Sequence, residues 1–331
     1  MNRIAAYLGA LIVSALSIAA TADEASPSLR PVHTYSIVAR DHETGELGVA
    51  VQSHYFGVGS RVIWAQPGIG AVATQSFIDP AYGPDGLALM SNGKTAAEAL
   101  KSLLAVDERS DWRQVGMVDA HGNVANHTGP RSIGWFCDSA NAGYSVQANL
   151  MQNSNVCEAM SKAFEAGKGD LAERLMIALE AAESVGGDAR GRQSAAMLVV
   201  SADKSAPAWG GRMFDLRVED HAEPLIELRR LLTVARAYRL MSEGDAHMAS
   251  GDLASTTASY ERASALLPGN HELIFWHALT LAANGEVDAS LPLFSKAFTL
   301  WPSWREIVQR MPAAGLLPDD PELMRKIVAV N

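Results

Sequence analysis

The sequence predicts an α+β fold: a domain of short strands and paired helices, followed by an all-α region of helical repeats. Three observations lead to this prediction. From residue 34 to 222, strand-like runs come in blocks and helical runs come in pairs, unlike the strict alternation of a doubly wound sheet. From 223 to 331 only helical periodicity remains. Within that second part, residues of the same kind recur at a fixed interval.

Composition and charge exclude several classes of protein. The chain has 331 residues, a length typical of two domains, and 48% of them are hydrophobic, which is enough to form buried cores. Its formal net charge is -10, and it contains no block of lysine or arginine. An acidic protein without a basic patch is a poor match for nucleic acid or an anionic membrane surface, so we expect neither as a partner.

The first 22 residues are typical of a signal peptide. Arg3 provides a positive start, residues 4–20 are uncharged and mostly apolar, and Ala-Thr-Ala then offers a signal-peptidase site. The alternative is an uncleaved anchor, although the apolar run is short of the ~20 residues that span a bilayer. We expect a periplasmic or secreted protein that starts at Asp23 and has no transmembrane span after signal removal. Residues 23–33 are expected to be a linker or propeptide.

Strands are predicted where short apolar or alternating runs lie between turn residues. These runs are 34–39, 47–52, 62–66, 71–75, 114–119, 124–127, 143–149, 194–200 and 213–218. Helical spacing predicts helices at 87–91, 95–105, 155–165 and 170–184. Thr95 and Glu98 form a capping box at the start of the second of these helices, and residues 82–86 are expected to be a loop.

The two cysteines, Cys137 and Cys157, leave two interpretations open. In an oxidising compartment they pair if they lie close together in space, and otherwise they are two buried thiols. Neither lies near a histidine and cysteine cluster with zinc spacing, and we expect no metal or organic cofactor.

The helical part contains an internal repeat of 34 residues. Four pairs of like residues have this offset: Gly251 and Gly285, Tyr260 and Phe294, Ala263 and Ala297, Pro268 and Pro302. Gly244 and Ala278 fit an earlier small position of the same pattern. This resembles the tetratricopeptide repeat, which presents a concave face to a protein partner. The alternative is an unrelated bundle of helical hairpins. Two units cover residues 236–304, and flanking helices at 223–235 and 304–330 are expected to cap them.

The first domain resembles a known bacterial family through a set of short phrases. They are TYSIVARD, GELGVAVQS, GAVATQ, YGPDGL, RQVGMVDAHG, HTG, GGDARGRQSAAMLVV and DLRVEDH. Together they resemble domain of unknown function family 1028, which is grouped with the N-terminal nucleophile (Ntn) hydrolases. The resemblance spans residues 34 to about 232. It implies a four-layer αββα sandwich over 34–222, and it implies no substrate.

The resemblance assigns a role to Thr34. In Ntn hydrolases the first residue of the mature chain attacks a carbonyl carbon, and its own α-amine takes the proton. An α-amine has a pKa of about 7.7–8.0, so much of it is unprotonated near neutral pH. Thr34 opens the first predicted strand, where the superfamily places its nucleophile, although threonine is also common in ordinary strands. Its nitrogen is an amide until the bond between His33 and Thr34 is cut, so the mechanism needs a second cleavage.

Six further residues are candidates near this nucleophile. Ser53 and His54 end the second predicted strand, where they would position Thr34 or simply form a turn. His127 follows a hairpin and is a candidate for lining a substrate pocket. Three charged side chains lie close together in a glycine-rich loop. They would form either an anion-binding site for the substrate or an internal salt bridge that fixes the loop. They are Asp188, Arg190 and Arg192.

The leading functional hypothesis is an exported hydrolase of a carbon–nitrogen bond, with a small-molecule or peptide amide as substrate. Thr34 is its expected nucleophile, and the helical repeats bind a protein partner. The second hypothesis is a non-catalytic scaffold that binds a ligand at the cell envelope. A third is an enzyme that uses Ser53 with His54 and needs no second cleavage.

Overall fold

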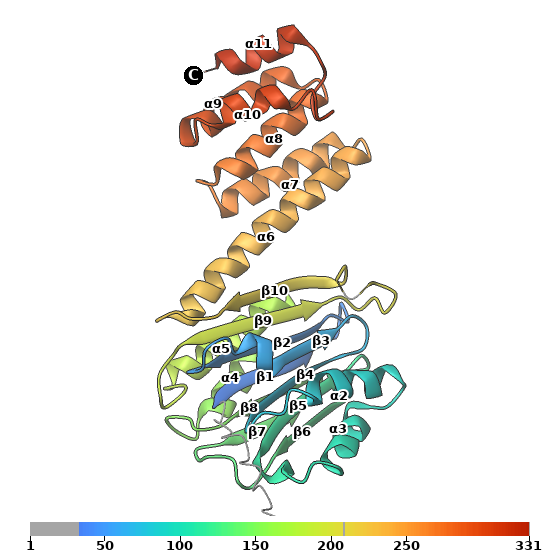
Figure 1. Ribbon diagram of the computed structural model, residues 1–331, viewed down its shortest axis with the longest axis vertical. Helices are drawn as coiled ribbons and strands as arrows, with labels where there is room; N and C mark the ends of the chain where they lie inside the picture. Colours follow the sequence, from blue (N-terminus) through green and yellow to red (C-terminus); the bar gives the residue numbers. More distant parts are fainter. Residues whose placement is uncertain (1–32, 208, 331) are drawn as a thin grey trace, which may run out of the picture. The chain divides into compact units, whose positions relative to one another are not determined.

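Two antiparallel β-sheets form the first part of the chain in the computed structural model, which describes residues 33–207 and 209–330 (Figure 1). The larger sheet has the order β10 (Arg212–Val218), β9 (Ser194–Val200), β2 (Leu47–Ser53), β1 (Thr34–Arg40), β8 (Tyr144–Ala148) and β7 (Cys137–Asn141). The smaller sheet has the order β3 (Ile63–Gln66), β4 (Gly70–Ser76), β5 (Arg113–Asp119) and β6 (Val124–Thr128). The expected signal peptide, 1–22, and residues 23–32 lie outside the described residues.

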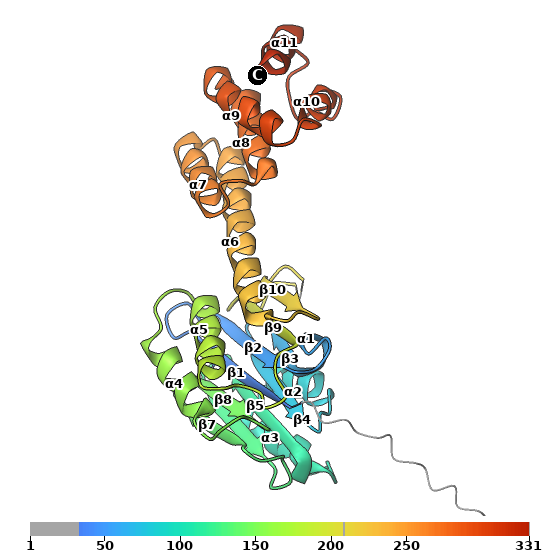
Figure 2. The same ribbon diagram turned by 90° about the vertical axis from the view of Figure 1, so that its left-hand side faces the viewer.

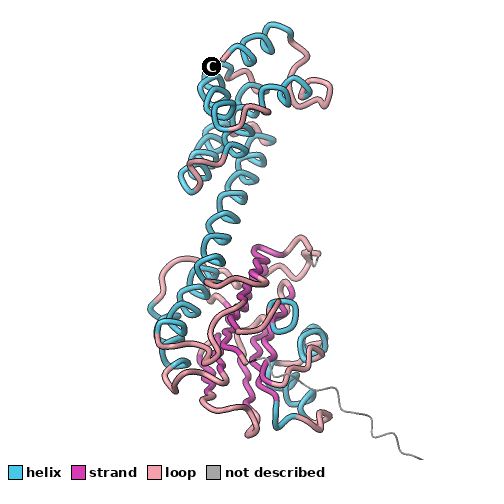
Figure 3. Tube along the Cα trace, turned by 60° about the vertical axis from the view of Figure 1, so that its left-hand side comes forward, coloured by secondary structure: helices cyan, strands magenta, loops and turns pink. Residues whose placement is uncertain are grey.

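Helices accompany both sheets. In the first part of the chain they are α1 (Gly59–Val62), α2 (Tyr82–Ser91), α3 (Ala96–Leu104), a 3-10 turn (Ser110–Trp112), α4 (Val156–Ala166) and α5 (Leu171–Ser184). The C-terminal part contains α6 (Pro224–Ala249), α7 (Leu253–Leu266), α8 (His271–Ala283), α9 (Val287–Leu300), α10 (Trp304–Ile307), a 3-10 turn (Val308–Arg310) and α11 (Pro321–Ala329). In the described part of the chain every strand precedes α6, and Figure 3 shows helices and loops without strands in the part that ends at the C-terminus.

Three apolar clusters join the elements of the first part, whose arrangement is shown in Figures 1 and 2. Between the sheets, side chains of β1, β2 and β9 pack against those of β3, β4 and β5. On the other face of the larger sheet, a second cluster includes α4, α5 and the start of α6. A third joins α2 and α3 to the other face of the smaller sheet. The predicted mixed α+β organisation, with a helical C-terminal region, is confirmed at this level.

The strand register brings several strand ends to one edge of the sheets. The first residue of β1, Thr34, is opposite Ser53, the last residue of β2. Ser53 is in turn opposite Ser194, the first residue of β9. On its other side β1 pairs with the end of β8, where Tyr35 is opposite Ala148. The loops that follow β2 and β8 and precede β9 therefore gather around Thr34.

Two local predictions in the first part need correction. Residues 82–86 form the start of α2 and are not a loop. The glycines allow close packing here, because a Cβ on Gly83 would lie 2.2 Å from Cγ of Trp64. Strand β7 was not predicted, because it is a short edge strand with polar, partly exposed residues. The predicted capping box of Thr95 and Glu98 is confirmed.

The expected flanking helices also differ from the structure. Residues 223–235 do not form a separate helix, because α6 continues without a break through 224–249 and its first 19 residues after Pro224 contain no glycine or proline. Residues 304–330 are divided into α10 and α11 by a segment that contains Pro312, Gly315 and Pro318. Within the described part of the chain, no helix combines the length and the apolar character needed to cross a bilayer.

A buried histidine makes the stability of the helical region depend on pH. His277 of α8 stacks on Tyr260 at a centroid distance of 4.7 Å, and its Nε2 has no hydrogen-bond partner among the described residues. Burial lowers the pKa of His277 to about 4. Below pH 6.5 the unfolded chain binds a proton that the folded chain does not, so stability is complete above pH 6.5 and falls as the pH drops towards 4.

We expect this histidine to reduce the free energy of unfolding of the helical region by about 3 kcal/mol across that interval. Thermal unfolding of the His277→Gln variant, measured between pH 7 and pH 4, should show a weaker loss than the wild type. Parallel pH profiles for the two proteins would contradict the assignment.

Candidate functional site

Thr34 lies buried at the start of β1, and its hydroxyl points to a second hydroxyl group. Thr34 Oγ1 donates a hydrogen bond to Ser53 Oγ over 3.2 Å, from the adjacent strand β2. Both side chains are fully buried, and their residues are paired directly across the two strands. The structure therefore places the predicted nucleophile beside one of its two predicted positioning residues.

The peptide bond that precedes Thr34 is held by two donors. The carbonyl oxygen of His33 accepts a hydrogen bond of 2.5 Å from Ser53 Oγ and one of 2.7 Å from Arg190 Nη2. Donors placed on a carbonyl oxygen polarise the carbonyl group and stabilise negative charge that develops on the oxygen. This carbonyl belongs to the bond whose cleavage would release the amine of Thr34.

The carbonyl oxygen of Thr34 is held from both sheets. It accepts hydrogen bonds from the amide of Asn149, over 3.0 Å, and from Gln75 Nε2, over 3.2 Å. Asn149 directly follows β8 in the larger sheet, whereas Gln75 belongs to β4 in the smaller one. The backbone of Thr34 is thus fixed at the boundary between the sheets.

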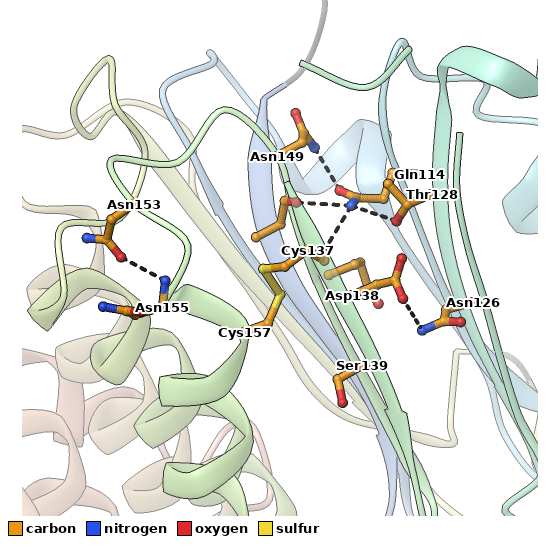
Figure 4. Close-up of a disulfide and its surroundings, with 12 residues drawn as sticks. Gln114, Asn126, Thr128, Cys137, Asp138, Ser139, Asn149, Asn153, Asn155 and Cys157 are labelled. Atoms are coloured by element: carbon orange, nitrogen blue, oxygen red, sulfur yellow. Dashed lines mark hydrogen bonds between the residues drawn. A yellow bond between two sulfur atoms is a disulfide. The ribbon is translucent and has the colours of Figure 1, made fainter. Parts of the chain in front are cut away.

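A buried network of polar side chains surrounds these contacts. Gln75 Nε2 donates to Gln114 Oε1 over 2.7 Å, and Asn149 Nδ2 donates to the same atom over 2.9 Å. Gln114 Nε2 donates in turn to Thr128 Oγ1, at 2.9 Å, and to the carbonyl oxygen of Cys137, at 3.2 Å (Figure 4). A buried network whose members are paired holds side chains in one arrangement.

Asp188 and Arg190 form an ion pair at the site. Arg190 donates to the two carboxylate oxygens of Asp188 at 3.1 and 2.7 Å, and the Asp188 side chain is fully buried. The second of these oxygens also accepts the backbone amide of His54 at 3.0 Å. The internal salt bridge considered from the sequence is present, and it aims Arg190 at the His33 carbonyl.

The other candidates lie away from the hydroxyl of Thr34. The ring of His54 has Nδ1 3.3 Å from the carbonyl oxygen of Arg192, and the exposed Arg192 side chain binds Glu183 and Glu223. His127 contacts the carbonyl oxygen of Ser110 through Nε2 at 2.9 Å. It is opposite Val115, which packs against α2 and α3, so it is on the face of β6 that these helices cover.

His33 belongs to the site although sequence reasoning did not select it. Its Nδ1 is 2.9 Å from Asn149 Oδ1, and its side chain is buried. Burial is the largest influence on this imidazole and lowers its pKa, although the hydrogen bond to Asn149 acts in the opposite direction. The neutral ring is therefore favoured.

Gln75, Gln114, Asn149 and the pair Ser36 and Gln147 were also missed. Ser36 Oγ bonds to Gln75, and Gln147 Nε2 bonds to Ser36 Oγ. One signal was available in the sequence. In strands with buried, apolar residues, a polar side chain at every second position indicates a polar strip on one face.

Backbone strain is concentrated beside the contacts to Thr34. Among the described residues, the non-glycine positions with positive φ are Ser76, at 69°, and Leu150, at 53°. Each directly follows a residue that binds the carbonyl oxygen of Thr34. Conformations of this kind cost about 1–3 kcal/mol and cluster at functional sites.

Within the described residues, no three potential metal ligands of the His, Cys, Asp or Glu type gather at one place.

Cys137 and Cys157 form a disulfide (Figure 4). It joins the first residue of β7 to the first turn of α4, with the Cα atoms 6.1 Å apart. This decides the question that the sequence left open. The bond also lies beside the polar network, because Gln114 binds the carbonyl oxygen of Cys137.

Comparisons with known proteins support a family assignment. No curated protein matches the chain. A crystal structure of a protein from Silicibacter pomeroyi matches with a TM-score of 0.55 and 29% identity, covering 61% of this chain and 89% of that one. Anbu (ancestral beta-subunit) from Yersinia bercovieri matches with a TM-score of 0.33 and 12% identity, over 60% of this chain and 93% of that one. The Silicibacter protein is described by the same family model that matches residues 34–228 here, and the chain therefore belongs to the family of unknown function DUF1028.

Proposed function

We propose that this protein is an exported amide hydrolase of the N-terminal nucleophile type, with a four-layer αββα domain and Thr34 as nucleophile. One observation carries the proposal. The buried hydroxyl of Thr34 lies at the head of β1 beside Ser53, and the carbonyl group just before it is bound by Ser53 and Arg190. A nucleophile and a polarised carbonyl group thus lie together at one peptide bond.

The first reaction in this proposal is the cleavage of the chain at His33. Thr34 Oγ1 attacks the carbonyl carbon of His33, and an ester bond forms while the carbon–nitrogen bond to Thr34 breaks. The hydroxyl proton passes to the departing nitrogen. Water then hydrolyses the ester, which yields a carboxylate on His33 and restores the hydroxyl of Thr34 beside a free α-amine. Arg190 and Ser53 stabilise the oxyanion in the first step.

The mature enzyme then repeats the same chemistry on a substrate amide. The α-amine of Thr34 takes the hydroxyl proton as Oγ1 attacks the carbonyl carbon, and it returns the proton to the leaving amine. Water releases the acid from the acyl-enzyme. Ser53 orients the attacking oxygen, and Gln75 and Asn149 fix the backbone of Thr34. His54 has no role in this scheme: its Nδ1 lies 3.3 Å from the carbonyl oxygen of Arg192, and the hydroxyl of Ser53 donates to the carbonyl oxygen of His33.

Intact-mass analysis tests the proposal at its first requirement. Protein recovered after export should begin at Thr34 and should release amines from simple amides. A chain that begins at Asp23 and is inactive would favour the ligand-binding scaffold. A chain that begins at Asp23 and hydrolyses amides would favour an internal nucleophile.

Replacing Arg190 with lysine should slow the cleavage at His33. Lysine keeps the charge beside Asp188 but cannot bind both carboxylate oxygens and the His33 carbonyl oxygen in the same forked geometry. Loss of one oxyanion donor costs about 100-fold in rate. The rate at which full-length chain is converted, followed by mass spectrometry, measures the effect. Arg192→Lys is the matched control, and equal rates in the two variants would remove Arg190 from the mechanism.

We also propose that α6 to α9 form two tetratricopeptide-like units that bind a protein partner. The residues at the 34-residue offset have matching environments. Gly251 and Gly285 both follow a helix with positive φ, at 79° and 89°, and the aromatic rings of Tyr260 and Phe294 are both fully buried. Gly244 lies against Tyr260, where a Cβ would be 2.8 Å from the ring. This is the close helix contact that the repeat pattern requires.

Export to the periplasm or the medium belongs to the same proposal. The disulfide between Cys137 and Cys157 is the observation that supports it, because structural disulfides persist in oxidising compartments. The predicted signal peptide would provide the route.

A further inference from the structure

We infer that the segment Ile133–Phe136, here called the aromatic loop, binds a large apolar group of the substrate amide. This inference rests on the proposed function and adds a substrate class to it. The substrates would be amides that carry an aromatic ring or an alkyl chain next to the bond that is cleaved. Three features of the structure support it: the exposure of the loop, its fixed backbone and its place beside Thr34.

Three large apolar side chains of this short loop face solvent. Ile133 is 37% exposed, Trp135 is 61% exposed and Phe136 is 44% exposed. Single exposed apolar residues are normal on protein surfaces, whereas several together mark binding sites. Tryptophan and phenylalanine offer wide, rigid surfaces for an apolar ligand at a small cost in conformational entropy.

The backbone of the aromatic loop is fixed at several points. The carbonyl oxygen of Ile133 accepts the amide of Leu150 at 3.0 Å, and that of Trp135 accepts the amide of Met151 at 3.1 Å. Cys137, which follows Phe136, is held by the disulfide to α4. The aromatic side chains are therefore displayed by an anchored segment.

Residues 149–151 connect the aromatic loop to the site. The amide of Asn149 binds the carbonyl oxygen of Thr34, and the next two amides bind the aromatic loop. On their other side, the carbonyl oxygen of Leu150 accepts the amide of Ala189 at 3.1 Å, and Met151 forms a β-bridge with Asp188. Residues 149–151 thus lie between the backbone of Thr34 and the aromatic loop. The aromatic loop is therefore two strand spacings, or about 10 Å, from the backbone of Thr34.

This distance suits a substrate group attached to the reacting carbonyl carbon or to the leaving nitrogen. Asp188 and Arg190 stay bound to each other after His33 has been released, so the charge of each is compensated within the site. This leaves the adjoining apolar surface as the place for an uncharged group of the substrate. Leu150 connects Asn149, which binds Thr34, with the aromatic loop. Its positive φ indicates that the backbone of this connection is held in a strained conformation.

Three small amides test the inference. They are N-methylacetamide, N-methyl-phenylacetamide, with the ring on the acyl side, and N-(2-phenylethyl)acetamide, with the ring on the amine side. The enzyme would be a chain expressed from an initiator Met followed directly by Thr34, which retains all described strands and helices, and it would be oxidised after purification until Cys137 and Cys157 have paired. Release of primary amine gives kcat/KM for each. We expect one of the ring-bearing amides to be preferred at least about tenfold over N-methylacetamide.

Trp135→Ala should lower kcat/KM for the preferred ring-bearing amide about tenfold more than it lowers kcat/KM for N-methylacetamide. Trp209→Ala is the matched control. Trp209 is also exposed, but it lies in the connection between β9 and β10, at the opposite end of β9 from Ser194. Equal rates for all three amides in the wild type would overturn the inference, as would an equal loss for all three in Trp135→Ala. The proposed function would survive either result.

A second readout remains if the wild type hydrolyses none of the amides, a result that would reject the proposed function. Calorimetry of N-methyl-phenylacetamide and N-(2-phenylethyl)acetamide with the Thr34→Ala chain measures binding without chemistry. Binding of at least one of them should weaken about tenfold when Trp135→Ala is added. Unchanged affinity, or no binding to either chain, would reject the aromatic loop as a site.

Discussion

Thr34→Ala is expected to abolish amide hydrolysis, with a fall in rate of about 1,000-fold or more, because the nucleophile itself is removed. The same change should leave the bond between His33 and residue 34 intact, since the hydroxyl that attacks the His33 carbonyl is also gone. Two measurements on one preparation of the variant test this prediction: the release of amine from a panel of amides, and the intact mass of the exported chain. Both readouts depend on the same oxygen atom and should be lost together.

Two matched variants separate chemistry from structure. Thr34→Ser keeps a hydroxyl that can reach Ser53, and it should retain both cleavage and hydrolysis. Thr34→Val keeps the shape of the side chain in this buried position but has no hydroxyl, so it should fail in both. Hydrolysis at the wild-type rate by Thr34→Val would exclude Thr34 as the nucleophile. Cleavage in Thr34→Val would show that another protease makes the cut.

The position of Thr34 could be predicted from the sequence because it depends on local signals. β1 and β2 are short, apolar and separated by a turn with Gly45, so their pairing as a hairpin was accessible. That pairing alone brings Ser53 opposite Thr34. The capping box at Thr95 is equally local. Predictions of this kind hold because the interacting residues are close in the chain.

The remainder of the site depends on contacts that sequence spacing does not contain. Gln75 and Gln114 come from the smaller sheet, and they reach Thr34 and Asn149 only because the two sheets pack face to face. His127 was selected as a residue after a hairpin, but the pairing of β5 with β6 places it on the face toward α2 and α3. Sheet-to-sheet packing therefore decides which polar residues share the site.

Removal of the disulfide between Cys137 and Cys157 should strongly destabilise the first part of the chain. The bond closes a loop with a sequence separation of 20. A cross-link over such a loop raises the free energy of unfolding by about 3 kcal/mol, chiefly by restricting the unfolded chain. The melting temperature of this part should then fall by about 6–12 °C in the Cys137→Ser, Cys157→Ser double variant.

Thermal unfolding of the double variant, with the wild type in reducing buffer as its control, measures this effect. The two samples should agree, because both lack the same bond. The loss of stability should also affect the site, because Cys137 anchors β7 and its carbonyl oxygen accepts a hydrogen bond from Gln114 Nε2. The side-chain oxygen of Gln114, Oε1, in turn accepts hydrogen bonds from Gln75 and Asn149. A double variant that melts with the oxidised wild type would show that the bond carries little of this stability. In that case the pairing of β7 with β8, together with the polar network, would hold β7 in place.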